Sequence, residues 1–193
     1  MSKLLDRVLV IDIESTCWSG QAPPPGQLSE IIEVGLCVVD TRRLERIEKR
    51  CILIRPVRSE ISPFCTQLTT LKAEDFHSAG TLADAVGILK REYRSLERLF
   101  ASWGDYDRRQ FEKVCKELTV PYPFGPTHLN VKNLFSLAYN LPSELALDAA
   151  CEHAGMALEG THHRGVDDAW NIAGLLCRVL AQCRGQELPP RGE

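Results

Sequence analysis

The feature that most constrains this chain is a short apolar run near its start that ends in two acidic residues. Residues 8–11 read Val-Leu-Val-Ile, and Asp12 and Glu14 follow with one isoleucine between them. A continuous apolar run predicts a strand buried on both faces. Side chains alternate along a strand, so Asp12 and Glu14 share one face, about 7 Å apart. Two carboxylates in an apolar environment repel each other, and a bound cation between them offsets this repulsion. The run therefore predicts a cation site.

The remaining patterns predict three more strands and five helices, with the last strand lying between helices in the sequence. β-branched and alternating apolar residues predict these strands at 30–40, 46–55 and 99–103, with a hairpin turn between the first two. The segment 61–75 shows no regular period and predicts short helical turns. Helical spacing predicts five helices: 82–97, one around Phe111, 131–139, 143–153 with Ser143 as its cap, and 165–183. This order predicts an α/β domain, with a mixed sheet of about five strands flanked by helices.

Length and composition limit the class of protein. The chain has 193 residues, 44% of them hydrophobic, which suits one domain, expected over 1–184 with a flexible tail at 185–193. The formal net charge is −3, so any polyanion must be held by local contacts. Eight cysteines form no C-x-x-C pair and predict reduced thiols in a cytoplasmic protein. No segment predicts a membrane span or a signal peptide, and no glycine-rich turn after residue 14 predicts a dinucleotide site.

Two further acidic positions stand at the ends of predicted elements, where functional residues concentrate. One lies at Asp105 or Asp107, after the strand at 99–103. The other is the pair 167–168, near the start of the last predicted helix and shortly after two adjacent histidines. Any single one of these residues is also compatible with an ordinary helix cap or a surface position. Their combination with the first strand is what indicates a functional site.

The order of these residues resembles the DEDDh family of 3′-to-5′ exonucleases, which have a ribonuclease H-like fold. The strings ISPFCTQLT at 61–69, SWGDYD at 102–107 and HRGVDD at 163–168 resemble the branch that trims the 3′ ends of histone mRNA and small RNAs. The resemblance covers residues 7 to about 180. Its motif spacing selects one member of each adjacent pair: Asp107 over Asp105, His163 over His162, and Asp168 over Asp167.

The resemblance implies a metal-dependent exonuclease that releases nucleoside 5′-monophosphates from RNA or short single-stranded nucleic acid. Two Mg²⁺ or Mn²⁺ ions would be held by four carboxylates, with Asp12 between the ions: Asp12, Glu14, Asp107 and Asp168. His163 would be the general base, since an imidazole accepts a proton at neutral pH. The terminal nucleotide would lie against Glu14, Ser15, Thr16 and His163.

Three alternatives stay open from the sequence. One is a DNA-preferring exonuclease of the same family, since no residue can be assigned to reading a 2′-hydroxyl. Another is an endonuclease of the ribonuclease H type, and the third is a nucleic-acid-binding protein without catalysis. Glu33, in the second predicted strand, is interpreted as a paired structural carboxylate rather than a catalytic one.

Overall fold

The fold is built on a sheet whose central strand is the acidic run described above. The computed structural model describes residues 3–20 and 22–186. Its five strands lie in the order β3-β2-β1-β4-β5. Their bounds are β1 Leu4–Ser15, β2 Ile31–Asp40, β3 Glu45–Leu53, β4 Arg98–Ser102 and β5 His128–Asn130. β2 is antiparallel to both β1 and β3, while β4 is parallel to β1 and to β5. The predicted mixed sheet is confirmed.

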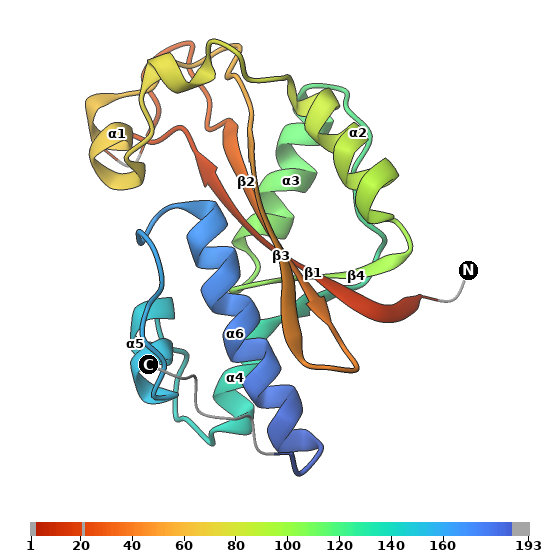
Figure 1. The fold of residues 1–193 in the computed structure, drawn as a ribbon. Helices are drawn as coiled ribbons and strands as arrows, with labels where there is room; N and C mark the ends of the chain where they lie inside the picture. The colour runs from red at the N-terminus through yellow and green to blue at the C-terminus, as the bar shows by residue number, and fades with distance from the viewer. Residues whose placement is uncertain (1–2, 21, 187–193) are drawn as a thin grey trace.

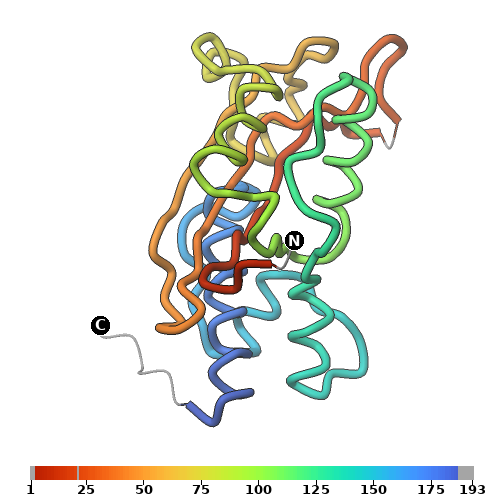
Figure 2. Tube along the Cα trace, turned by 90° about the vertical axis from the view of Figure 1, so that its right-hand side faces the viewer, coloured from red at the N-terminus to blue at the C-terminus, as the bar shows by residue number. Residues whose placement is uncertain are grey.

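Helices cover both faces of this sheet (Figure 1). Their bounds are α1 Pro63–Thr69, α2 Leu82–Tyr93, α3 Tyr106–Glu117, α4 Val131–Ala138, α5 Leu147–His153 and α6 Gly165–Cys183, with a 3₁₀ helix at Ala73–Phe76. α6 packs with α4 and α5 against one face, and α2 and α3 pack against the other. Figure 2 shows α1 at one end of the molecule and the β2–β3 turn with the end of α6 at the other.

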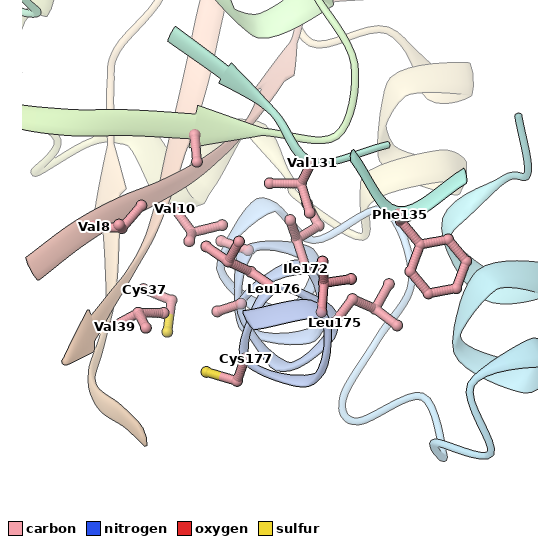
Figure 3. Packing of buried hydrophobic residues seen from close by; sticks show 14 of the residues in the cluster. Val8, Val10, Cys37, Val39, Val131, Phe135, Ile172, Leu175, Leu176 and Cys177 are labelled. Atoms are coloured by element: carbon pink, nitrogen blue, oxygen red, sulfur yellow. The ribbon is translucent and has the colours of Figure 1, made fainter. Parts of the chain in front are cut away.

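The two faces of β1 contribute to two different cores. Val8 and Val10 pack against Ile172 and Leu176 of α6, as Figure 3 shows, whereas Leu9 and the following odd-numbered residues face α2 and α3. Because the alternation continues, Asp12 and Glu14 extend the row of Val8 and Val10. The two acidic residues therefore point toward the side of the sheet that carries α6.

The first turn of α6 lies directly on the backbone of the sheet. A Cβ atom at Gly35 of β2 would lie 1.9 Å from the carbonyl carbon of Gly165, and one at Gly165 would lie 2.8 Å from the carbonyl oxygen of Asp12. No side chain larger than hydrogen fits at either position without displacing backbone. This contact between Gly35 and Gly165 sets the start of α6 beside the end of β1.

Three local predictions differ from the structure. The helix predicted over 82–97 ends at Tyr93, because Arg94 adopts a left-handed conformation with φ 52°. The helix predicted from Ser143 begins at Leu147 and is not capped by Ser143, and the carbonyl of Leu145 instead accepts a hydrogen bond from Trp103 Nε1 at 3.2 Å. Strand β5 was not predicted, since three residues are too few to show a period.

The last helix, residues 165–183, is confirmed at both ends. Of the predicted tail at 185–193, residues 187–193 lie outside the described part of the chain, and the proposed domain boundary stays a prediction. Among the described residues, no helix combines the length and hydrophobicity needed to cross a membrane.

Candidate active site

Three carboxylates from the two ends of the chain meet at the end of β1. Oxygens of Asp12, Glu14 and Asp168 all lie within 4.8 Å of one another. Asp12 and Glu14 come from the α6-facing side of β1, and Asp168 comes from the first turn of α6, one turn after the contact between Gly35 and Gly165. The period of the strand and the docking of the helix thus bring together residues that the sequence predicted as one site.

The fourth predicted acid, Asp107, lies beside β1 in the first turn of α3. Its side chain is 3% exposed, and its Oδ1 accepts a hydrogen bond from the backbone N–H of Ile13 at 3.0 Å. The neighbouring Asp105 instead lies 3.6 Å from both Arg108 and His128, away from β1. Of the two candidates, Asp107 is therefore the one that reaches the strand carrying Asp12 and Glu14.

Burial raises the pKa of every carboxyl group in this cluster, and repulsion from neighbouring carboxylates adds to the rise at Asp12 and Glu14. Desolvation raises the pKa of Asp12 well above its usual value, and the charges of Asp107, Asp168 and Glu14 raise it further. Burial and the nearby Glu33 raise the pKa of Glu14 to about 9. The pKa of Asp107 is raised to about 6, again mainly by burial, and the bond from Ile13 opposes this rise. Without a cation, such a cluster retains protons at neutral pH.

Two adjacent histidines lie against Asp168. His162 Nδ1 is 3.2 Å from Asp168 Oδ1, and the backbone N–H of His163 donates to Asp168 Oδ2 at 2.9 Å. The rings are 4.0 Å apart between centroids. His163 has a left-handed backbone with φ 63°, and its side chain is exposed. Partial burial and His162 lower the pKa of His163 below its usual 6.5, so its ring is neutral at pH 7.

The segment that carries the histidines is tied to the sheet by Glu33. This carboxylate is fully buried and lies opposite Glu14 in the β1–β2 register. Its Oε2 accepts a hydrogen bond from Arg164 Nε at 3.1 Å, and its Oε1 accepts one from the backbone N–H of Val166 at 3.2 Å. The interpretation of Glu33 as a paired carboxylate is confirmed. Its partner was missed, although Arg164 directly follows His163 in the sequence.

The other adjacent acid, Asp167, has a different role from Asp168. Its carboxylate accepts a hydrogen bond from the backbone N–H of Thr161 at 2.8 Å and forms an ion pair with Lys49 of β3. These contacts direct Asp167 into the loop before α6. Asp168 alone of this pair belongs to the carboxylate cluster.

Ser15 and Thr16, predicted to line the terminal nucleotide, are both buried. The Thr16 hydroxyl donates to the carbonyl of Leu28 and accepts from the backbone N–H of Glu30, each at 2.9 Å. Ser15 lies beside Gln110, whose Nε2 is 3.4 Å from the Ser15 hydroxyl. The side chains of Ser15 and Thr16 therefore fix the backbone at the end of β1. Of residues 14–16, Glu14 is the one whose side chain reaches the cluster.

Comparisons with known proteins agree on one family. The sequence model of the RNase T family, described as exonuclease, matches residues 9–176. Human 3′-5′ exoribonuclease 1 is 29% identical over 188 residues, covering 91% of this chain and 52% of the relative, so the chain spans about half of that protein. The 3′-5′ exonuclease Snipper of Drosophila melanogaster is also 29% identical, over 90% of this chain and 69% of its own.

A solved structure gives the same result at the level of the fold. The nuclease domain of 3′hExo, a DEDDh family member solved with bound rAMP, superposes with a TM-score of 0.83 at 25% identity, over 100% of both chains.

Proposed function

The chain belongs to the RNase T exonuclease family, and on this basis we propose that it shortens single-stranded RNA from the 3′ end, releasing nucleoside 5′-monophosphates. The family match confirms the resemblance indicated by the motifs, and the likeness to the 3′hExo nuclease domain confirms the ribonuclease H-like fold. The observation that carries the proposal is the meeting of Asp12, Glu14 and Asp168 within 4.8 Å, with histidines against Asp168. The relatives named as exoribonucleases favour RNA over DNA.

The site fits two divalent cations, Mg²⁺ or Mn²⁺, because its clustered donors are carboxylate oxygens, which hard cations prefer. The raised pKa values of Asp12 and Glu14 support this assignment, since cations would replace the protons that the cluster otherwise retains. Asp12, Glu14 and Asp168 would hold the ions, together with Asp107, which is bonded to the same strand. When bound, the ions supply positive charge to the attacking and leaving oxygens of an in-line phosphoryl displacement.

His163 is the proposed general base. Its ring is neutral at pH 7 and accepts the proton of the attacking water. Attack of the water oxygen on the last phosphodiester forms a new P–O bond and breaks the bond between phosphorus and the 3′ oxygen of the preceding nucleotide, which takes up a proton from solvent to become a 3′-hydroxyl. The terminal nucleotide then leaves with a 5′-phosphate. His162 keeps its contact with Asp168 and orients that carboxylate.

The terminal nucleotide is proposed to lie against residues 14–16. Thr16 and Ser15 support this segment from within the fold through the bonds described above. Glu14 is the residue of the three whose side chain reaches the cluster. It is therefore placed both to hold a cation and to orient the attacking water.

Product analysis on matched RNA and DNA oligomers labelled at the 5′ end tests the proposed function. With Mg²⁺ or Mn²⁺, RNA should shorten one nucleotide at a time from the 3′ end, with nucleoside 5′-monophosphates as the released product. RNA should be degraded about tenfold or more faster than DNA of the same sequence, which corresponds to about 1.4 kcal/mol.

The other outcomes identify the alternatives. Internal fragments without a 3′ ladder would indicate an endonuclease, and faster degradation of DNA would assign the DNA-preferring branch. Binding of RNA without metal-dependent hydrolysis would indicate a nucleic-acid-binding protein without catalytic activity. Each of these results contradicts the proposal as stated.

A further inference from the structure

A polar hollow opens beside Asp107, at the carboxyl ends of β4 and β5. Its volume is about 520 Å³, and it lies between the first turns of α3 and α4. β4 is parallel to both β1 and β5, so the hollow lies at the same edge of the sheet as the carboxylate cluster. The carboxyl edge of parallel strands is where ligands of open α/β sheets bind.

The walls of the hollow carry two cations without partners. Arg109 and Lys113 are exposed on successive turns of α3, and neither side chain has a hydrogen bond or ion pair with any described residue. The third cation of the wall, Lys132, is paired with Glu144 at 3.2 Å. The acidic Asp105 in the wall is compensated by Arg108, 3.6 Å away. The hollow thus presents positive charge in a protein whose formal net charge is −3.

The remaining wall suits a nucleotide chain. Trp103 and Tyr106 supply aromatic surface, with Tyr106 56% exposed, and Asn130 and Asn133 supply polar side chains. Aromatic rings beside cations are the combination with which proteins hold single strands without reading their sequence. Tyr106 immediately precedes Asp107, so the hollow and the cluster meet at the start of α3.

We propose that this hollow holds the RNA nucleotides immediately upstream of the one being removed, with Arg109 and Lys113 contacting their phosphates. This inference rests on the proposed function. Arg109 and Lys113 lie about 6 Å apart along the helix axis, a separation compatible with successive phosphates of an extended strand. A strand whose terminal nucleotide lies at the carboxylate cluster has its next nucleotides at this edge of the sheet. The hollow gives a chain with net negative charge a local hold on a polyanion.

The test compares a long and a short substrate for wild type and the double variant Arg109→Ala, Lys113→Ala. The long one is a single-stranded RNA of about 12 nucleotides, a length within the range such grooves cover. The short one is a dinucleotide without a 5′-phosphate, which has no phosphate upstream of the scissile bond. The ratio of kcat/KM for the long over the short substrate should fall about tenfold or more in the variant, mainly through KM. Lys116→Ala, on the same helix outside the hollow, should leave the ratio unchanged.

Binding measured separately from hydrolysis keeps this inference distinct from the proposed function. Fluorescence anisotropy in EDTA should give weaker binding of the long RNA by the double variant, with a shallower dependence on salt, even if no hydrolysis occurs. An unchanged substrate ratio together with unchanged binding overturns the proposal. An equal loss on both substrates also overturns it, because it would mean that these residues act at the terminal nucleotide.

Discussion

The two halves of the candidate active site are held in different ways. The fixed half comprises Asp12, Glu14 and Asp107, which lie on the central strand or are hydrogen-bonded to it. The loop half comprises His162 and His163, in a segment without regular structure before α6. The fixed half takes its rigidity from the pairing of β1 with β2 and from the bond between Ile13 and Asp107, whereas the loop half depends on a few tertiary contacts. Metal ligands need constant geometry, and a general base must let substrate enter and product leave.

Asp168 joins the two halves. Its carboxylate contacts His162 and the backbone of His163, and it also lies within 4.8 Å of Asp12 and Glu14. The helix start that carries it is held against the sheet by the contact between Gly35 and Gly165. A change in the loop half can therefore reach the proposed metal ligands through Asp168. Three measurements test this division.

The largest effect is expected in the fixed half. Asp12→Asn should remove Mn²⁺ binding in calorimetry and reduce hydrolysis at least about 10⁴-fold, since Asp12 would lie between both ions. The metal-free variant should be at least as stable as wild type, because one source of repulsion in the cluster is gone. Glu117→Gln, which neutralises an exposed carboxylate at the end of α3, serves as the control. Unaltered Mn²⁺ affinity in Asp12→Asn would refute the central position of this residue.

An intermediate effect is expected in the loop half. His163→Ala should lower kcat by about 10²- to 10⁴-fold and leave Mn²⁺ affinity nearly unchanged. In wild type the rate should fall as the pH drops below the lowered pKa of His163, because the ring then carries a proton, and His163→Ala should lack this limb. His162→Ala should have a smaller effect on kcat and a larger one on metal affinity, through Asp168. The reverse ranking would assign the base to His162.

The smallest effect concerns stability without metal, to which the two halves contribute with opposite signs. The pKa of Glu14 rises from 4.5 to about 9 on folding, so between these values the folded state binds more protons than the unfolded state. The free energy of unfolding should then fall as pH rises from about 6 to about 8, by about 3 kcal/mol for one proton. The lowered pKa of His163 acts the other way, and costs stability only as pH falls below about 6.5.

Urea unfolding in EDTA across this pH range measures the effect, and saturating Mg²⁺ should flatten the slope. Stability that rises with pH in EDTA would mean that the carboxylates of the fixed half are already ionised in the metal-free protein.

The parts predictable from sequence are those fixed by local pattern. The apolar run before Asp12 determines a central strand, its period of two places Glu14 on the same face, and the apolar stripe of residues 165–183 gives the last helix with its bounds. The ends of other elements depended on contacts that no period encodes. The left-handed Arg94 shortens α2, and the bond from Trp103 to the Leu145 carbonyl delays α5.

The contacts around the site were less accessible to sequence reasoning. The partner of Glu33 is 131 residues away in the chain, and only the docking of α6 brings Arg164 to it. The hollow combines side chains of α3 and α4 with the end of β5, a strand too short to predict. Motif spacing alone chose one residue from each pair of candidate acids and histidines. The structure adds a physical reason for choosing Asp107, namely its hydrogen bond with the backbone N–H of Ile13. For the two histidines, the assignment stays a prediction.

The contact between Gly35 and Gly165 also determines when during synthesis the carboxylate cluster is assembled. A nascent chain whose first three strands have left the ribosome already carries Asp12 and Glu14, but their partner Asp168 has not yet been translated. The first turn of α6 must then reach β2 across more than a hundred residues of intervening chain, a late event in domain folding. The three-carboxylate cluster is thus complete only in a chain whose α6 has been synthesised and docked on the sheet.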